Sequence, residues 1–327
     1  MENTNKWRSG IMGVVVGDAL GLPVQFLSRA EVLREPVTKM QGYGTFHMPE
    51  GTWSDDGSMT MATICSLSEQ KKLDFADIME RFVAWEYQGE YTPFGKAFDQ
   101  GRTCLAAIYN YKNGMGVATC GLTDERSNGN GSLMRILPVC LYAYEKMQKK
   151  EMSEKKALAA IHQASALTHA HMRSQMGCGF YFFMTKAILD GTGTLQECLQ
   201  KGVDDAVRFY HKDVRNWTQL AHYGRLFHLS EFAVVPSEEI RSTGYIVDSL
   251  EAAVWSLITT QSFKEAALKA VNLGGDTDTI GAIACGLAGL YYGYESIPKA
   301  WLEVIKKREW IEAVCEGMDS RDLADVL

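Results

Sequence analysis

The 327-residue sequence lacks the patterns that would place it among disulfide-rich, thiolate-metal or nucleic-acid-binding proteins. Its eight cysteines are dispersed and include no C-x-x-C pair, which argues against a disulfide framework and for a reducing compartment. A net charge of -7 at pH 7 leaves little basic surface for nucleic-acid phosphates. We therefore expect a cytoplasmic protein that does not bind nucleic acid.

Long apolar runs and strand-like alternation are also missing. The longest apolar stretch, residues 280–292, falls short of the ~20 residues that a membrane span needs. The polar N-terminus, residues 1–6, does not resemble a secretory signal. No segment alternates apolar and polar residues in the manner of a half-buried strand. These absences predict an all-α protein without a membrane association, and we expect it to be a monomer.

Helical periodicity covers most of the chain, and a hydrophobic content of 46% is ordinary for a globular protein. We expect a compact multi-helix single domain spanning residues 1–327. Gly13, Gly17 and Gly21 in the first helix should let another helix approach closely. The main expected helices cover residues 7–20, 57–69, 74–86, 102–111, 157–167, 174–189, 195–229, 243–258, 263–273, 298–307 and 309–327.

Two segments place hydroxyl and carboxylate side chains where an apolar helix begins. One is Gly274-Gly275-Asp276-Thr277-Asp278-Thr279, and the other is Ser54-Asp55-Asp56. Each alone could be an ordinary helix N-terminus, where the macrodipole stabilises an acid by about 0.3–1 kcal/mol. Two such clusters in one chain favour a shared cation site instead, because buried like charges repel unless a cation compensates.

The donor set indicates which ions would fit. Hydroxyl and carboxylate oxygens without His or Cys select hard divalent ions, so Mg²⁺ or Mn²⁺ is favoured over zinc. The four acids Asp55, Asp56, Asp276 and Asp278 carry enough charge for two ions. Asp18 is interpreted as structural, bonding backbone or a neighbouring loop, with a role in orienting the metal loops as the alternative.

Three further segments are candidates for ligand contacts. The loop from Ser127 to Arg135 is rich in Gly and Asn and can turn successive N–H groups toward a phosphate, although it could equally be a simple turn. His169 and His171 are two positions apart and cannot share one helix face, so we do not expect them to bind zinc as a pair. Each could instead form a hydrogen bond at a helix boundary or contact a ligand hydroxyl or phosphate. Asp99 is either a helix-start acid or a substrate contact.

Together these motifs resemble the ADP-ribosylglycohydrolase family, which includes the dinitrogenase-reductase-activating glycohydrolase and the ADP-ribosylarginine and ADP-ribosylserine hydrolases. The resemblance spans nearly the whole chain, from Gly17-Asp18-Ala19-Leu20-Gly21 to Gly275-Asp276-Thr277-Asp278-Thr279. It implies an all-α fold with a dinuclear Mg²⁺ or Mn²⁺ site at the head of a cleft. The metal ligands it implies are Ser54, Asp55, Asp56, Asp276, Asp278 and Thr279, with Ser54 standing where the family commonly has Thr.

The resemblance also implies the substrate side of the site. The loop Asn128, Gly129, Asn130, Gly131 and Ser132 is similar to one that cradles a diphosphate, and His169 to a ribose or phosphate contact. The metals would hold the 2″ and 3″ hydroxyls of the distal ribose while water displaces the group on its anomeric carbon, releasing ADP-ribose.

One position departs from the family pattern. Gln25 lies where the family often has a Glu, and an amide cannot accept a proton near neutral pH. We count Gln25 as a substrate contact and take Asp55, Asp56 and Asp99 as the catalytic candidates. The expected function is hydrolysis of an ADP-ribose conjugate that is carried on a protein arginine. The alternatives are a catalytically silent ADP-ribose or nucleotide binder, and a hydrolase of a serine-linked or 1″-phosphate conjugate.

Overall fold

The computed structural model describes residues 5–191 and 193–319, and within these ranges it has sixteen α-helices and no β-strand. The all-α prediction is therefore confirmed. None of the described helices has the length and apolarity that crossing a bilayer requires. The helices are α1 (Lys6–Gly21), α2 (Arg29–Arg34), α3 (Asp55–Gln70), α4 (Phe75–Gln88), α5 (Arg102–Lys112), α6 (Leu137–Gln148), α7 (Glu154–Ala166), α8 (Met172–Leu189), α9 (Leu195–Tyr210), α10 (Trp217–Leu220), α11 (Leu229–Phe232), α12 (Ile246–Ile258), α13 (Phe263–Val271), α14 (Thr277–Tyr292), α15 (Lys299–Leu302) and α16 (Arg308–Asp319).

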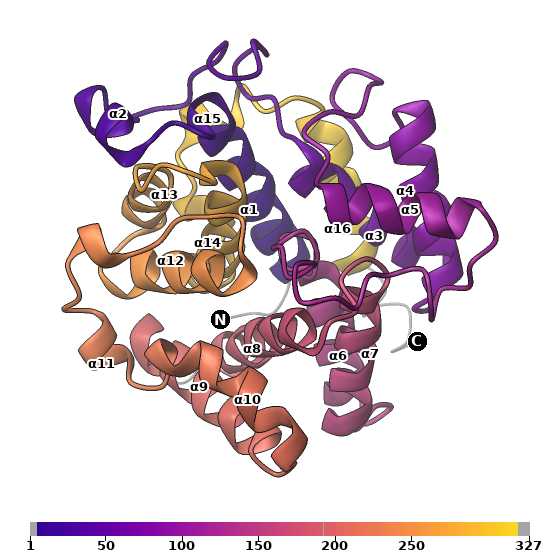
Figure 1. The fold of residues 1–327 in the computed structure, drawn as a ribbon. Helices are drawn as coiled ribbons and strands as arrows, with labels where there is room; N and C mark the ends of the chain where they lie inside the picture. The colour runs from indigo at the N-terminus through magenta and orange to yellow at the C-terminus, as the bar shows by residue number, and fades with distance from the viewer. Residues whose placement is uncertain (1–4, 192, 320–327) are drawn as a thin grey trace.

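The helices α1 and α14, from opposite ends of the chain, pack against each other at the centre of the molecule (Figure 1). Their backbones are close because glycines face the contact. A Cβ atom on Gly17 would lie 2.2 Å from the carbonyl oxygen of Gly281, and one on Gly13 would lie 2.2 Å from that of Cys285. The predicted close approach is confirmed, and it brings the C-terminal part of α1 beside the first turn of α14.

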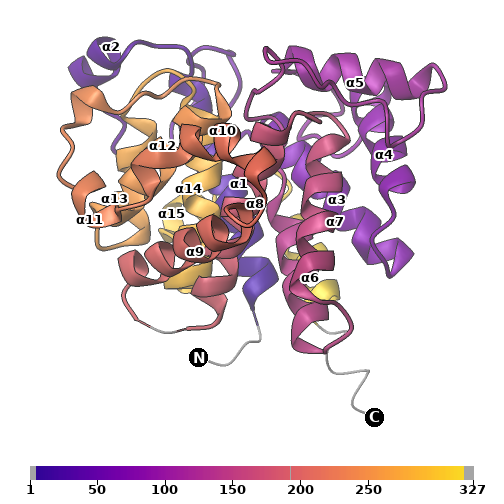
Figure 2. The same ribbon diagram turned by 60° about the horizontal axis from the view of Figure 1, so that its bottom comes forward.

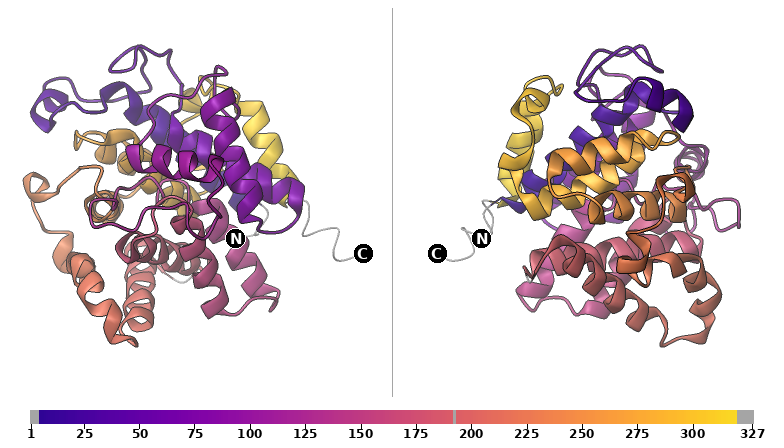
Figure 3. Two further views of the ribbon diagram at one scale, coloured as in Figure 1. Left: turned by 45° about the vertical axis from the view of Figure 1, so that its right-hand side comes forward. Right: turned by 90° about the vertical axis from the view of Figure 1, so that its left-hand side faces the viewer.

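The other helices surround this central pair. α12 and α13 pack on α14 at one side, and α3, with α4 and α5 beyond it, lies at the other side of α1 (Figure 2). α16 packs against both α1 and α3, which Figure 3 shows from the side. α8 contacts α14 and is itself covered by α7 and α9. The first turns of α3 and α14 therefore face each other across the middle of the fold.

The region 195–229, which was predicted to be helical, is divided into several helical pieces. α9 ends at Tyr210, and the side chain of Asp213 then accepts a hydrogen bond from the Arg215 N–H and starts a separate short turn. One helix prediction was wrong in length. The helix expected over 298–307 is only α15, because the backbone beyond it pairs with the loop before α3. There Lys306 N–H donates to Gly51 (3.0 Å) and the Trp53 indole N–H donates to the Lys306 carbonyl (2.9 Å). The prediction for 320–327 lies outside the described residues.

Candidate active site

The acids of both motifs lie in the first turns of buried helices. α3 begins at Asp55 rather than at Gly57, so Asp55 and Asp56 are inside its first turn. α14 begins at Thr277, which puts Asp278 in the corresponding position there. A helix N-terminus stabilises negative charge through its free N–H groups and its dipole, so both helices favour ionised acids at this place.

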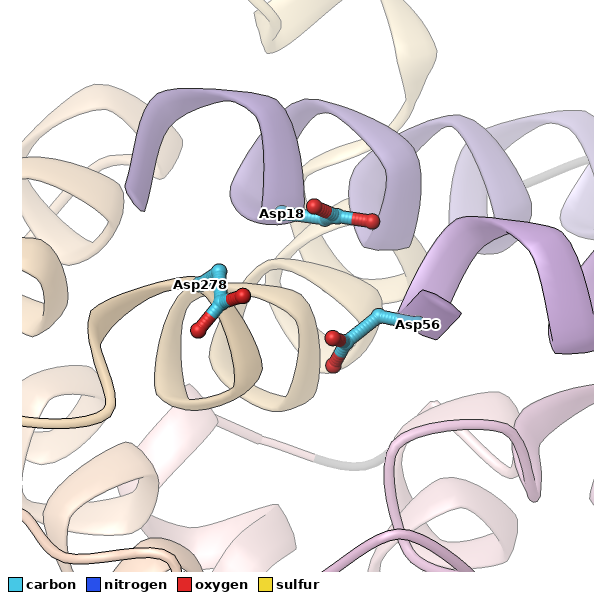
Figure 4. A group of neighbouring side chains, drawn as sticks. All are labelled: Asp18, Asp56 and Asp278. Carbon is cyan, nitrogen blue, oxygen red and sulfur yellow. The ribbon is translucent and has the colours of Figure 1, made fainter. Parts of the chain in front are cut away.

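Three carboxylates from three different helices converge (Figure 4). Asp18 of α1, Asp56 of α3 and Asp278 of α14 each contribute an oxygen, and these oxygens lie within 4.8 Å of one another. All three side chains have no exposed surface. Such a concentration of buried negative charge is unfavourable unless protons or a cation offset it.

Asp18 holds the α3 motif in place. Its carboxylate accepts hydrogen bonds from the backbone N–H groups of Ser54 and Gly57, each at 2.9 Å. The predicted bonding of Asp18 to a neighbouring loop is confirmed, and its placement in the central cluster also supports the alternative role in orienting the metal loops. Burial raises the pKa of Asp18 to about 7 despite these hydrogen bonds.

Three oxygen atoms of the other two carboxylates lack protein partners. Oδ1 of Asp56 and both carboxylate oxygens of Asp278 are buried and accept no hydrogen bond within the described part of the chain. The hydroxyls of Ser54 and Thr279 lie 3.2 and 3.4 Å from Oδ2 of Asp56. Burial, and then the neighbouring carboxylates, raises the pKa of Asp55, Asp56 and Asp278 well above the ordinary aspartate value. Orphaned oxygens of this kind fit hard divalent cations.

Asp276 lies beside this cluster and is held by two amides. Its Oδ2 accepts a hydrogen bond from Nδ2 of Asn130 (2.5 Å), and its Oδ1 accepts a longer one from Nε2 of Gln25 (3.4 Å). Gln25 is placed by the backbone, since Phe26 N–H donates to the carbonyl of Gly275 (2.7 Å). Gly275 has a φ of 75°, and a Cβ there would lie 2.2 Å from the Ser242 carbonyl oxygen. A glycine is therefore needed at position 275 for the loop before α14 to pack against the segment that contains Ser242.

A cavity of about 640 Å³ opens next to the acids. Several predicted residues reach its wall, whereas Ser54, Asp56 and Asp278 are not part of the lining. The predicted residues in the wall are Gln25, Asp55, Asp99, Asn128, Gly129, Asn130, Gly131, His169, Asp276 and Thr279. The structure thus brings the cation-site candidates and the ligand-contact candidates to one place.

The glycine-rich loop forms one wall of the cavity. It is fixed by pairing with the segment before α12: Asn130 N–H donates to Gly244, and Ile246 N–H donates to Asn128, each at 3.0 Å. The N–H groups of Gly129 and Gly131 donate to no acceptor among residues 5–191 and 193–319. Free N–H groups in a fixed loop suit an anionic ligand.

Two residues of the predicted loop do not reach the cavity. The hydroxyl of Ser132 accepts a hydrogen bond from the Ser165 hydroxyl (2.9 Å) and lies 3.5 Å from the Cys178 sulfur, so its side chain belongs to the core. Arg135 is also fully buried and absent from the cavity wall. A helical turn after the glycines carries both side chains to the far side of the loop, which sequence spacing did not reveal.

The two histidines have different positions. His171 is the N-cap of α8: its Nδ1 accepts from the Arg173 N–H (3.2 Å), and its Nε2 lies 3.2 Å from Glu125. His169 is buried and lines the cavity, with Nδ1 in hydrogen-bond contact with the Thr168 hydroxyl (2.8 Å). The helix-boundary interpretation therefore holds for His171, whereas the predicted ligand contact of His169 stays a prediction that its place in the cavity wall allows.

Asp99 lies in the wall of the cavity and does not cap α5, whose N-cap is Gly101. Its backbone has a φ of 60°, a conformation that Asp tolerates better than most residues. Oδ2 of Asp99 has no hydrogen-bond partner among the described residues. Burial raises its pKa to about 6.

Sequence reasoning missed three charged residues of the cavity wall, namely Arg102, Glu125 and Arg126. Arg126 directly precedes the Ser127 loop, and this proximity was an available signal. Arg102 begins α5, and nothing in its local sequence separates it from an ordinary surface arginine.

Comparison with known proteins adds to this geometry. Residues 2–326 match the family model described as ADP-ribosylglycohydrolase. An ADP-ribosylarginine hydrolase of Serratia proteamaculans is 30% identical over 317 residues, covering 97% of this chain and 80% of the relative. An ADP-ribosyl-[dinitrogen reductase] glycohydrolase of Rhodospirillum rubrum is 31% identical over 293 residues, covering 89% and 87%. A solved structure titled ADP-ribosylglycohydrolase-related protein complex is similar with a TM-score of 0.78 and 29% identity, covering 97% of this chain and 98% of that chain.

Proposed function

The chain belongs to the ADP-ribosylglycohydrolase family and is an ADP-ribosyl glycohydrolase, and we propose that it cleaves ADP-ribose from arginine side chains of proteins. The observation that carries the arginine assignment is the carboxylate of Asp99 in the cavity wall. A carboxylate is complementary to the guanidinium of a modified arginine, which offers N–H donors in a fixed planar arrangement. The names of two relatives, an ADP-ribosylarginine hydrolase and a dinitrogen reductase glycohydrolase, agree with this choice.

The cavity provides a place for each part of such a substrate. The free N–H groups of Gly129 and Gly131 would bind the diphosphate, with Arg126 adding positive charge at the exposed rim. His169 would contact a ribose or phosphate oxygen. The distal ribose would then lie over Asp55, with its anomeric carbon between the acids and Asp99.

The proposal also assigns the residues that would bind the cations. Two Mg²⁺ or Mn²⁺ ions, when bound, would supply positive charge for the ribose hydroxyls and the hydrolytic water. Their ligands would be Ser54, Asp55, Asp56, Asp276, Asp278 and Thr279, with Asp18 holding the α3 segment against them.

We assign the role of proton acceptor to Asp55. It is the one member of the Ser54-Asp55-Asp56 motif in the cavity wall, so its carboxylate is the one of that motif that a bound water can reach. Water would form a bond to the anomeric carbon while the bond from that carbon to the guanidine nitrogen breaks. The water proton would pass to Asp55 and then to the released guanidine.

The test is release of ADP-ribose from arginine-linked, serine-linked and 1″-phosphate-linked conjugates, each with Mg²⁺, Mn²⁺ or EDTA. We expect release from the arginine conjugate that EDTA abolishes. Asp99→Asn should reduce this release and leave ADP-ribose binding intact, since Asn tolerates the same backbone conformation and removes only the charge. Release that persists after the metals are stripped would contradict the proposed metal dependence, and preference for another conjugate would contradict the arginine assignment.

The position of Gln25 favours a second candidate function, that of a catalytically silent ADP-ribose binder. Its Oε1 is buried without a partner, and its amide lies beside Asp276 where the family often has a carboxylate. ADP-ribose that binds in the presence of metal without release from any conjugate would indicate a silent binder. Recovery of activity in Gln25→Glu would then identify Gln25 as the cause.

A further inference from the structure

Arg135 is a buried cation that the proposed reaction does not use. Only 1% of its surface is exposed, and it forms no ion pair among the described residues. Its Nη2 donates to the Thr168 hydroxyl (2.8 Å) and to the Ala164 carbonyl (3.2 Å), its guanidinium carbon lies 4.8 Å from the centre of the Phe82 ring, and its Nε has no partner. Burying a guanidinium without a carboxylate is costly, so the hydrogen bond to Thr168 calls for a functional explanation.

The Thr168 hydroxyl connects Arg135 to His169. Its oxygen lies 2.8 Å from Nη2 of Arg135 and 2.8 Å from Nδ1 of His169. A guanidinium can only donate, so the Thr168 oxygen accepts from Arg135. The single hydroxyl proton of Thr168 then has two neighbouring acceptors, the Cys104 sulfur and Nδ1 of His169. Sulfur accepts only weakly, so the proton goes to Nδ1, which leaves the imidazole proton on Nε2.

The Nε2 atom of His169 is on the cavity side of the ring. A Cβ atom on Gly129 or on Gly131 would lie 3.4 or 3.5 Å from it, so the absence of side chains at both positions gives it access to the cavity. No residue in the described ranges accepts a hydrogen bond from Nε2. A bound ligand oxygen is the remaining acceptor.

We propose that Arg135 is a positioning residue that acts through Thr168 to keep His169 in the Nε2–H tautomer, so that a neutral imidazole donates a hydrogen bond to the ligand. The identity of the ligand oxygen, on the ribose or the diphosphate of ADP-ribose, rests on the proposed function. Burial, and secondly the Arg135 charge, lowers the pKa of His169 to about 3, which agrees with a neutral ring. The arrangement gives the site a donor of fixed direction whose protonation does not follow the solvent.

The direct test is ¹⁵N NMR of the full-length protein labelled at histidine, without substrate. The chain has seven histidines, and His169→Gln assigns the relevant signals. We expect His169 to show a protonated Nε2 and an unprotonated, hydrogen-bonded Nδ1. A proton on Nδ1 would overturn the proposal whatever the substrate is, because the measurement needs no ligand.

Thr168→Val and Thr168→Ser form the matched pair for function. Valine removes the hydroxyl with little change in shape, whereas serine keeps it. Thr168→Val should shift His169 toward a mixture of tautomers and raise both the Kd for ADP-ribose and the KM for the arginine conjugate about fivefold, with kcat almost unchanged. Thr168→Ser should retain the wild-type tautomer and affinity.

Arg135→Gln tests whether the Arg135 guanidinium is what fixes the tautomer of His169. Circular dichroism and thermal unfolding show whether this variant folds. The tautomer signal should change as in Thr168→Val; where this variant does not fold, the valine and serine pair decides. Equal tautomer signals and equal ADP-ribose affinities in the wild type and Thr168→Val would refute the role of the Arg135–Thr168 contact. Failure of hydrolysis with the wild-type tautomer intact would instead count against the proposed substrate alone.

Discussion

Gln25 donates its side-chain amide to Oδ1 of Asp276 across 3.4 Å, although the two residues are 251 positions apart in the chain. Replacing Gln25 by Glu would set a second carboxylate against Asp276 and the buried acids beyond it. Without metal, repulsion should lower the thermal stability; with Mn²⁺, the added oxygen should strengthen binding. Thermal unfolding in EDTA and in Mn²⁺ should therefore show a larger metal-dependent shift for Gln25→Glu than for the wild type.

The control for this variant is Gln25→Leu, which removes the amide and adds no charge. It should lower stability in EDTA and in Mn²⁺ alike. A metal-dependent shift in the unfolding temperature that is the same in all three proteins would mean that residue 25 does not interact with the cations.

Two threonines in the first turn of α14 give a matched test of the metal ligands. The Thr279 hydroxyl lies 3.4 Å from Asp56, whereas the Thr277 hydroxyl donates to the Gly21 carbonyl (2.8 Å). Thr279→Val should weaken Mn²⁺ binding about 10–100-fold. Thr277→Val should cost about 1 kcal/mol of stability and leave the Mn²⁺ affinity near the wild-type value. Isothermal titration with Mn²⁺ measures both, and equal affinities would remove Thr279 from the ligand set.

The acids also predict how pH affects the metal-free protein. Burial and mutual repulsion raise the pKa of Asp18 to about 7 and those of Asp55, Asp56 and Asp278 well above the ordinary value. In the folded state these groups hold protons that the unfolded chain releases above about pH 4. The stability of the EDTA-treated protein should therefore fall as pH rises from about 4 through 7.

Bound metal should remove most of this loss, because it replaces the protons as the compensating charge. At pH 8, saturating Mn²⁺ should raise the Tm by about 5 °C or more, and at pH 5 by less. A metal-dependent shift that is independent of pH would show that the acids are not protonated in the free protein.

Gly131 tests the fit of the loop against His169. A Cβ atom there would lie 2.8 Å from the Cys104 sulfur and 3.0 Å from Cε1 of His169. Gly131→Ala should displace the loop or the ring and weaken ADP-ribose binding about tenfold. Gly224→Ala is a suitable control because a Cβ at that position has open space and the residue lies outside the cavity wall. Unchanged ADP-ribose affinity in Gly131→Ala would show that the loop moves freely to admit the methyl group.

The helical fold and the two acidic motifs could be predicted from the sequence because each rests on a local pattern. Apolar periodicity indicated the helices, and the glycines of the first helix indicated that another helix would pack closely against it, although not that this helix would be α14. The break after Tyr210 and the short α15 could not be foreseen, because distant contacts decide them. Lys306, for example, leaves the helical path to pair with Gly51.

In the site, too, the features with a local sequence pattern could be predicted, and those that depend on distant contacts could not. The Asp276 and Asp55 motifs were visible as charge beside apolar helices, but the position of Asp18 among the buried carboxylates depends on how α1 packs on α14. Ser132 was expected at the ligand and lies in the core, since one turn of backbone decides which way a side chain points. The contact of Arg135 with Thr168 joins residues 33 positions apart and has no local signature.

The pairing of α1 with α14 has a consequence for biosynthesis. Asp18 leaves the ribosome early and Asp278 only with about the last sixth of the chain, so the nascent protein carries an incomplete set of acids for most of its synthesis. Until α14 emerges, the glycine face of α1 has no partner and the cation ligands cannot assemble. Metal loading and activity should therefore begin only after translation is nearly complete, and chains that stop before α14 should contribute neither.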